Sequence, residues 1–198
     1  MASGGVPSPE GVRIRPYRAA DHKAGRRLWR ELVEHRGELY AQPDRSGRGG
    51  GDGDSGAGFE EYLTRLDLSG LWVADSSADG VVGFVGLTLG GPSGEGRGEP
   101  TAGCIDPVVV TRRLRGHGIG RALLATVADE ARRRGLTQLT VSPWARDQAA
   151  LRSLHAAGFG SVSSVTLAYT LARPDTPSRG HSAEPDAALD LYDLRFLS

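Results

Sequence analysis

The segment that decides the fold is residues 108–121, which read VVVTRRLRGHGIGR. Three valines form an apolar run typical of a buried strand, and an arginine-rich turn leads to glycines at 116, 118 and 120. Glycines let the backbone approach a ligand closely, and the first N–H groups of a helix, with its dipole, favour an anion. Charge-assisted donors surround the same point: Arg112, Arg113, Arg115 and Arg121. The segment therefore predicts a binding site for a pyrophosphate.

Two other kinds of phosphate site do not fit this segment. A P-loop requires Gly-Lys followed by Ser or Thr, and the chain has no such run. A dinucleotide fingerprint requires G-x-G-x-x-G close to the start of a fold, whereas residues 116–120 have the spacing G-x-G-x-G in the middle of the chain. ATP or GTP bound by a P-loop, and dinucleotides, are therefore excluded.

On the N-terminal side, we expect strands and helices in alternation after a flexible segment at 1–11. Alternating residues predict a strand at 12–15, and Asp21 can cap a helix with Leu28, Trp29, Leu32 and Val33 on its apolar side. The remaining predictions are a helix over 21–40, a Gly-rich flexible loop over 42–58, a short helix over 59–66 and a hairpin of strands 71–74 and 81–89.

On the C-terminal side, the pattern continues with strand, helix, strand and helix. The predicted elements are a strand at 105–110, a helix at 123–134 stopped by Gly135, a strand at 136–141 and a helix from Ala145 or Asp147 to Gly158. A strand at 162–171 and a flexible loop at 172–188 follow. The apolar residues 189–197 predict a last strand that returns to the sheet.

The composition excludes several classes of protein. The 198 residues suit a single domain over 12–198, and 24 basic residues balance 24 acidic ones, so we expect no nucleic-acid partner. No run approaches the roughly 18 apolar residues of a membrane span, and the start lacks the features of a signal peptide. Cys104 is the only cysteine, which excludes internal disulfides and a cysteine-rich zinc site. We expect a cytoplasmic protein that binds neither metal nor membrane.

The pattern Arg115-x-x-Gly118-x-Gly120 after an apolar strand resembles the acyl-CoA signature of the GNAT N-acetyltransferase superfamily. The order of predicted elements over 12–198 is similar to that of the same family. Residues 146–159, with Ala150 and Gly158-Phe159, resemble a later block of the family. The resemblance implies an α/β fold: a mixed, mostly antiparallel sheet of six to seven strands, flanked by about four helices.

The resemblance also implies which groups bind acetyl-CoA, the co-substrate of the family. The backbone of Val108, Val109 and Val110 would pair with the pantetheine arm and polarise the thioester carbonyl. The amides of Arg115, Gly116, His117, Gly118, Ile119, Gly120 and Arg121 would hold the pyrophosphate, and Asp147 would lie near the pantetheine. The sheet would splay between the strand ending at Val110 and the strand starting near Leu136, which makes room for the arm.

Two positions depart from the family pattern. Asp147 stands where the family often has Asn, and Leu154 stands where it often has the Tyr that protonates the leaving thiolate. His155 is adjacent to Leu154 and is the candidate acid. Asp106 is the candidate base, because it lies two residues before Val108 on the same predicted strand and could reach an amine directly or through water.

The sequence thus predicts an acetyl-CoA-dependent N-acetyltransferase. It would transfer the acetyl group directly to a primary amine of a small molecule or protein, without a covalent enzyme intermediate. Two alternatives stay open: a CoA-binding regulatory domain with weak catalysis, which Leu154 permits, and an interaction module that forms a homodimer through its C-terminal strand.

Overall fold

A computed structural model describes residues 9–40, 58–65, 68–89, 102–162 and 195–196 of the chain. The chain divides into two compact units, Met1–Pro143 and Trp144–Ser198, and each is described by itself. None of the helices within the described ranges has the length and hydrophobicity of a membrane-spanning helix. The predicted loop at 172–188, the predicted loop at 42–58 except Gly58, which begins a helix, and most of the predicted N-terminal segment 1–11 lie outside the described residues.

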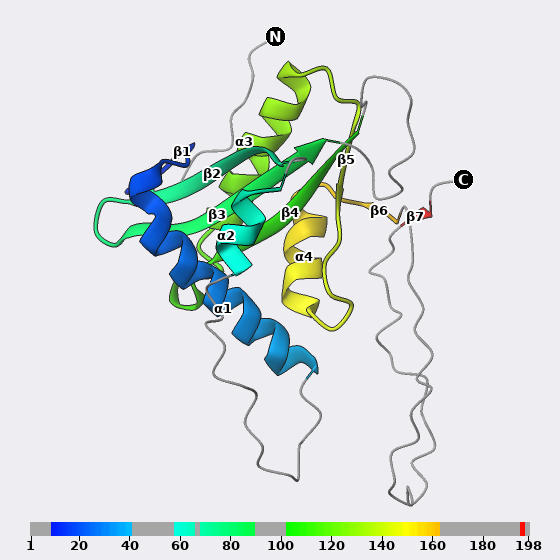
Figure 1. The fold of residues 1–198 in the computed structure, drawn as a ribbon. Helices are drawn as coiled ribbons and strands as arrows, with labels where there is room; N and C mark the ends of the chain where they lie inside the picture. The colour runs from blue at the N-terminus through cyan, green and yellow to red at the C-terminus, as the bar shows by residue number, and fades with distance from the viewer. Residues whose placement is uncertain (1–8, 41–57, 66–67, 90–101, 163–194, 197–198) are drawn as a thin grey trace, which may run out of the picture. The chain divides into compact units, whose positions relative to one another are not determined.

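The first unit is built on a five-stranded sheet in the order β1-β2-β3-β4-β5 (Figure 1). Its strands are β1 (Val12–Pro16), β2 (Leu68–Ser76), β3 (Gly80–Leu89), β4 (Ala102–Val110) and β5 (Gln138–Val141). The first four strands pair antiparallel, and β5 pairs parallel to β4. The predicted fold class, a mixed and mostly antiparallel sheet flanked by helices, is confirmed.

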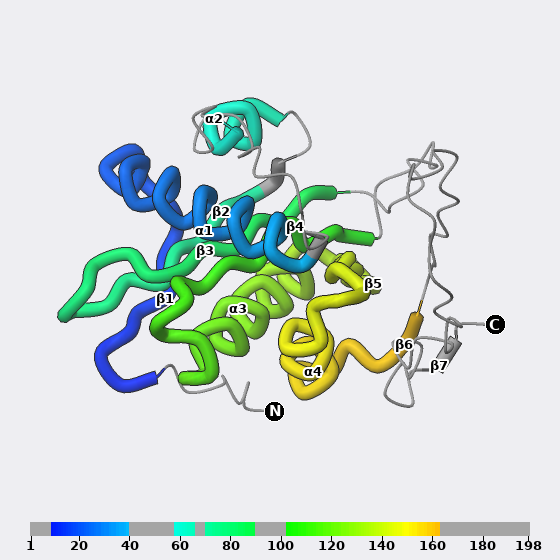
Figure 2. Tube along the Cα trace, turned by 90° about the horizontal axis from the view of Figure 1, so that it is seen from below, coloured from blue at the N-terminus to red at the C-terminus, as the bar shows by residue number. Residues whose placement is uncertain are grey.

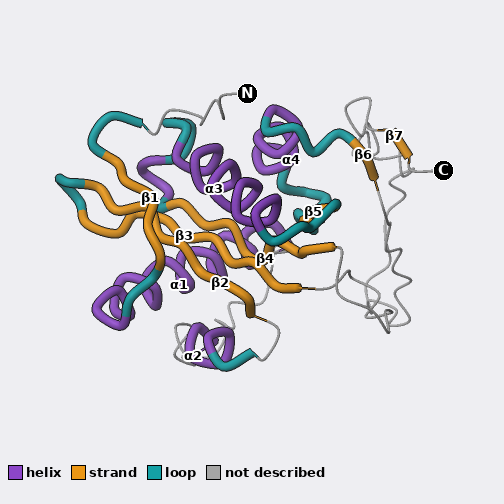
Figure 3. The backbone as a smooth tube through the Cα atoms, turned by 90° about the horizontal axis from the view of Figure 1, so that it is seen from above, coloured by secondary structure: helices purple, strands orange, loops and turns teal. Residues whose placement is uncertain are grey.

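Helices cover both faces of this sheet. The helices α1 (His22–Tyr40) and α2 (Gly58–Leu63) lie on one face, and α3 (Ile119–Arg133) lies on the other (Figures 2 and 3). Short 3-10 turns precede two of them: η1 (Ala19–Asp21) before α1 and η2 (Arg112–Leu114) before α3. The strand β4 therefore runs between two helical layers and leads through η2 directly into α3.

The hydrophobic core under α1 and α2 explains why these helices lie where they do. Its fully buried side chains include Leu28 of α1, Phe59 of α2 and Phe84 of β3, each at most 1% exposed. The ring of Phe59 lies 5.6 Å from that of Phe84 and 6.0 Å from that of Trp29. Burial of one side chain of this size stabilises the folded state by about 2 kcal/mol. The buried Phe59 therefore holds α2 against the sheet although the helix is short.

The second unit contains α4 (Gln148–Ala156) and the strands β6 (Ser161–Val162) and β7 (Arg195–Phe196). The two short strands pair parallel to each other in a sheet of their own. The prediction that 189–197 forms a strand returning to the main sheet is therefore wrong for its described residues. We expected one sheet of six to seven strands. Because β7 pairs with β6, the described residues instead form a five-stranded sheet and a separate two-stranded sheet.

Other boundaries differ by a few residues. The helix α3 begins at Ile119, four residues before the predicted 123, because the helical conformation starts directly after the left-handed Gly118. The strand β5 begins at Gln138 rather than at 136. Of the predicted strand over 162–171, only its first residue is among the described ones. The periodicity of apolar residues predicts that a helix or strand is present better than it predicts where the element ends, because the ends depend on capping and strand pairing.

Candidate functional site

The strand β4 has two segments that differ in their neighbours. The paired segment, 102–105, lies between β3 and β5, and its pairing with β5 ends at Ile105 and Val141. The open segment, 106–110, continues along β3 through the pairs Val108 with Val85 and Val110 with Gly83. No described strand pairs with the other edge of the open segment. This is where the sequence predicted that the sheet opens between the strand ending at Val110 and the next one.

The backbone groups of Val108 and Val110 point to that free edge. Thr111 donates its N–H to the carbonyl of Val82 in β3 (2.8 Å). Because successive residues of a strand direct their N–H and C=O groups to opposite edges, Val110 and Val108 point away from β3, and Val109 points toward it. The carbonyl of Val110 accepts a hydrogen bond from Nε of Arg115 (3.1 Å) on that side. The free edge thus offers the groups of Val108 and the N–H of Val110 to a ligand.

The start of α3 forms a cradle of N–H groups close to the end of this edge. Gly116 and Gly118 adopt left-handed conformations, with φ of 81° and 80°, which a residue with a side chain rarely adopts. The first helical bond runs from the N–H of Ala122 to the carbonyl of Gly118 (3.0 Å), so the N–H groups of Ile119, Gly120 and Arg121 precede it. The helix start can therefore hold an anion.

Two side-chain features complete the turn. The side chain of Ile119 is 2% exposed and anchors the first residue of α3. His117 donates from Nδ1 to the carbonyl of Arg115 (3.0 Å), which ties the turn to itself and leaves the backbone of His117 at the surface. The sequence-predicted residues 108–110 and 115–121 are thus brought together along one continuous path.

The four arginines of the segment separate into two pairs. Arg112 donates to both carboxylate oxygens of Glu38 on α1 (2.8 and 2.7 Å), and Arg113 contacts Asp79 in the β2–β3 turn (2.7 Å). Hydrogen bonding to these carboxylates raises the pKa of both guanidinium groups and lowers the pKa of Glu38. Arg115 and Arg121 are exposed beside the cradle. The second pair is therefore the better source of charge for a bound phosphate.

Asp106, the candidate base, is exposed at the beginning of the open segment. Its Oδ2 accepts a hydrogen bond from Arg65, which follows α2 (3.1 Å). The side chains of Asp106 and Arg65 are 56% and 40% exposed, so solvent screens this pair and reaches the carboxylate. Arg65 contacts Oδ2, and a carboxylate has a second oxygen whose lone pairs can accept a proton.

Two residues outside the predicted cofactor and catalytic set contact the ends of the open segment. Tyr62 of α2 donates its hydroxyl to the carbonyl of Asp106 (2.8 Å). Glu31 of α1 accepts from Oγ1 of Thr111 (2.9 Å) and from the N–H of Arg112 (3.0 Å). The signal that could have indicated Tyr62 is Gly86, since a glycine inside an apolar strand indicates a bulge or a close approach.

Asp147 and His155 lie in the second unit. Asp147 is the N-cap of α4, where its Oδ1 accepts from the N–H of Ala150 (2.9 Å). His155 is exposed in the last turn of α4, next to Leu154, which is 7% exposed. The cap gives Asp147 a role in the helix itself. The roles expected of both residues at the cofactor and the thiolate stay predictions.

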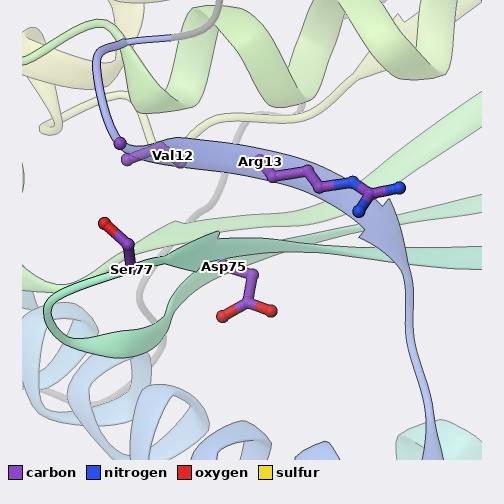
Figure 4. Close-up of a pocket in the computed structure, with 5 residues that line it drawn as sticks. Val12, Arg13, Asp75 and Ser77 are labelled. Carbon is purple, nitrogen blue, oxygen red and sulfur yellow. The ribbon is translucent and has the colours of Figure 1, made fainter.

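An open hollow of about 370 Å³ lies at the β1 edge of the sheet (Figure 4). Its lining residues are Gly11, Val12 and Arg13 at β1 together with Asp75 and Ser77. Asp75 is occupied there by a hydrogen bond from Nε of Arg15 (2.8 Å). None of the site residues predicted from the sequence lines this hollow, so we place the candidate site at β4 and α3.

Comparison with known proteins gives a family match. The model of the acetyltransferase (GNAT) family matches residues 38–159, which include β4, the turn and α3. A search of curated proteins gives no match.

Solved structures share the fold at low sequence identity. A glucosamine-6-phosphate N-acetyltransferase from Arabidopsis thaliana is 19% identical, with a TM-score of 0.52, and the match covers 82% of this chain and 100% of that chain. An aminoglycoside acetyltransferase from an uncultured soil metagenomic sample, in complex with sisomicin, is 17% identical with a TM-score of 0.57 (82% and 97% covered). An aminoglycoside N-acetyltransferase in complex with CoA is 18% identical with a TM-score of 0.57 (84% and 99% covered).

Proposed function

Because the chain belongs to the acetyltransferase (GNAT) family, we propose that it transfers an acetyl group from acetyl-CoA directly to a primary amine. The observation that carries the proposal is the continuity of the free β4 edge with the helix start. An extended arm with amide groups can pair with the edge of Val108 and Val110. A pyrophosphate joined to that arm then reaches the N–H groups at the start of α3.

The donor chemistry fits acetyl-CoA better than a simple anion. The cradle supplies backbone N–H groups between Arg115 and Arg121, and it follows a strand edge that a phosphate alone would not need. One solved structure with this fold is described in complex with CoA, which supports the same ligand class here. When bound, the thioester supplies an activated acetyl group, and the protein supplies position and charge.

The residues of this chain would contribute three steps. The free N–H groups of Val108 and Val110 would orient the acetyl carbonyl and stabilise negative charge on its oxygen. Asp106 would take the proton of the attacking amine, directly or through water. His155 would return a proton to the leaving thiolate, since Leu154 has no ionisable group. Without a dedicated acid the reaction remains feasible, because a thiol with a pKa of about 8.5 is already a fair leaving group.

Amines of small polar molecules are the first acceptors to test. Two solved structures with this fold are named as acetyltransferases of an aminoglycoside and of glucosamine 6-phosphate. Protein amines form the second class. Turnover with an amine would separate an enzyme from a CoA-binding domain that lacks catalysis.

The decisive measurement is calorimetric titration of the protein with acetyl-CoA and with CoA. The informative variant is Gly120→Glu, since a Cβ at this position meets only Cγ2 of Val110 at 3.8 Å and the side chain adds negative charge beside the cradle. Gly120→Gln is the matched control, with the same size and no charge. We expect Glu to weaken binding at least about tenfold more than Gln, or about 1.4 kcal/mol.

Three outcomes are informative. Binding that the Glu variant loses and the Gln variant largely keeps supports a phosphate at this helix start. Equal loss in both variants indicates a steric effect only. No binding of acetyl-CoA by the folded wild-type protein overturns the proposal and favours the interaction module, which deletion of residues 172–198 would then test through a change from dimer to monomer.

A further inference from the structure

The open segment of β4 is paired on one side only, yet it must keep a fixed geometry to bind an extended ligand. A strand segment with one neighbour has fewer backbone hydrogen bonds and opens more readily than one between two neighbours. Residues 106–110 therefore need other contacts if their edge is to be preformed. Such contacts are present at both ends of the segment, and both come from the helices on the same face of the sheet.

At the first end, the contact accompanies a bulge. Between paired positions, β3 has one residue, Gly86, where β4 has two, Asp106 and Pro107. Pro107 has no N–H to donate to the ladder. The hydroxyl of Tyr62, a side chain 3% exposed, donates to the carbonyl of Asp106 (2.8 Å). A Cβ on Gly86 would overlap this hydroxyl, so the glycine is what admits Tyr62 to the bulge.

At the second end, a carboxylate takes the same role. Glu31 accepts from Oγ1 of Thr111 and from the N–H of Arg112, with Thr111 only 6% exposed. The N–H of Thr111 is bound to the carbonyl of Val82 in β3, so the hydroxyl and the backbone of Thr111 are both held. This fixes the point at which the chain leaves β4 and turns toward the cradle.

We propose that Tyr62 and Glu31 are positioning residues that clamp the open segment from its two ends, so that the edge of Val108 and Val110 is set before a ligand arrives. Neither residue need touch the ligand. The inference deepens the proposed function, since preorganised donors cost less to order on binding. It also links the helices α1 and α2 to the cofactor edge through two side chains instead of through general packing, which Leu28 and Phe59 provide.

Amide hydrogen exchange of the ligand-free protein tests the clamp directly. The variants are Tyr62→Phe, Thr111→Val and Glu31→Ala, each of which removes hydrogen bonds while keeping shape or helix propensity. The matched control is Thr126→Val, which removes a hydroxyl that bonds only within α3, to the carbonyl of Ala122 (3.0 Å). We expect exchange over residues 106–112 to rise about fivefold per lost bond, the factor that corresponds to about 1 kcal/mol.

The same variants are titrated with acetyl-CoA to separate positioning from simple stability. We expect weaker affinity with unchanged exchange in α3 for Tyr62→Phe, Thr111→Val and Glu31→Ala, and neither effect for Thr126→Val. Unchanged exchange over 106–112, or raised exchange with unchanged affinity, would overturn the clamp. If the wild-type protein binds no acetyl-CoA, the proposed function fails, and the exchange of residues 106–112 by itself still decides whether the clamp exists.

Discussion

The paired and open segments of β4 belong to one strand and differ in what lies beside them. In the paired segment, Ile105 is 1% exposed between β3 and β5, and its backbone is part of two ladders. In the open segment, Val109 is equally buried at 3% exposed, but β5 has already ended. Apolar side chains therefore hold both segments in the core, and a free backbone edge arises because a neighbouring strand is short.

The difference teaches that this candidate site is made mainly of backbone. Side chains contribute by holding the segment from outside, as Tyr62 and Glu31 do. We expect Arg115 and Arg121, which are exposed, to add charge at its far end. Variants that act on one segment and spare the other can therefore test the comparison.

The largest effect is expected at Asp106, the ionisable side chain of the open segment. If its carboxylate is the general base, Asp106→Asn lowers kcat about 100-fold with an accepted amine. If it serves only as an anchor for Arg65, then Arg65→Ala has the same effect as Asp106→Asn. Steady-state kinetics of both variants distinguish the roles, with Asp129→Asn on α3, which pairs with Arg132, as a matched control.

The next largest effect is a loss of stability, and it compares Gly86, on β3 opposite the open segment, with Gly103, within the paired segment. A Cβ on Gly86 would overlap the Tyr62 hydroxyl and lie 2.6 Å from the backbone carbonyl of Asp106, neither of which can move freely. The three atoms nearest to a Cβ on Gly103, in the paired segment, would be the tips of leucine side chains at 2.9 to 3.1 Å. Gly86→Ala should therefore cost about 2 kcal/mol of unfolding free energy, and Gly103→Ala less than about 1 kcal/mol.

Urea denaturation measures both glycine variants. Gly37→Ala is the reference, because it lies in α1 with nothing within 4 Å of its added Cβ and should be neutral or slightly stabilising. Acetyl-CoA affinity should fall in Gly86→Ala only. Equal destabilisation by Gly86→Ala and Gly103→Ala would mean that the contact with Tyr62 adapts, and the two segments would then be alike in rigidity.

A smaller effect on acetyl-CoA affinity distinguishes Arg121 from Arg112. Arg121→Ala should weaken acetyl-CoA binding about fivefold, because an exposed cation beside the cradle contributes about 1 kcal/mol to an anion. Arg112→Ala should change affinity less than twofold, since Glu38 already binds its guanidinium. Titrations at low and high salt check this, and the loss in Arg121→Ala should shrink as salt rises. A larger loss of affinity in Arg112→Ala than in Arg121→Ala would mean that Arg112, and not Arg121, supplies charge to the bound phosphate.

The smallest effect on binding is expected from an ion-pair cluster at the opposite edge of the sheet. Arg15 donates to both carboxylate oxygens of Asp21 (2.7 and 2.8 Å), and these bonds hold the pKa of Asp21 below its usual value. A depressed folded-state pKa contributes stability above the unfolded pKa of about 3.9, and this stability is lost as pH falls through the folded value. Asp21→Asn should remove this part of the acid dependence.

Denaturation of wild type and Asp21→Asn between pH 6 and pH 2 measures the difference. The two curves of stability against pH should converge at the acidic end, where the wild-type carboxyl is protonated as well. Affinity for acetyl-CoA at pH 7 should be unchanged, because the cluster does not contact β4. A change in affinity would mean that the two edges of the sheet are coupled.

Features of the fold could be predicted from the sequence where they depend on interactions between residues close together in the chain. The valine run, the glycines and the helix of residues 108–133 were predictable because strand propensity, left-handed glycines and helix starts are local properties. The hairpin of β2 and β3 was predictable for the same reason. Family resemblance added the splay of the sheet, which no local pattern contains.

The sequence by itself therefore determined the kind of site: an apolar strand that leads through a glycine turn into a helix start. Only the tertiary structure decided where β5 ends, which carboxylates bind Arg112 and Arg113, and that Tyr62 and Glu31 hold the ends of the open segment. It also decided that β7 pairs with β6. Most of these contacts join residues tens of positions apart, and such pairs form only when packing of the whole domain brings them together.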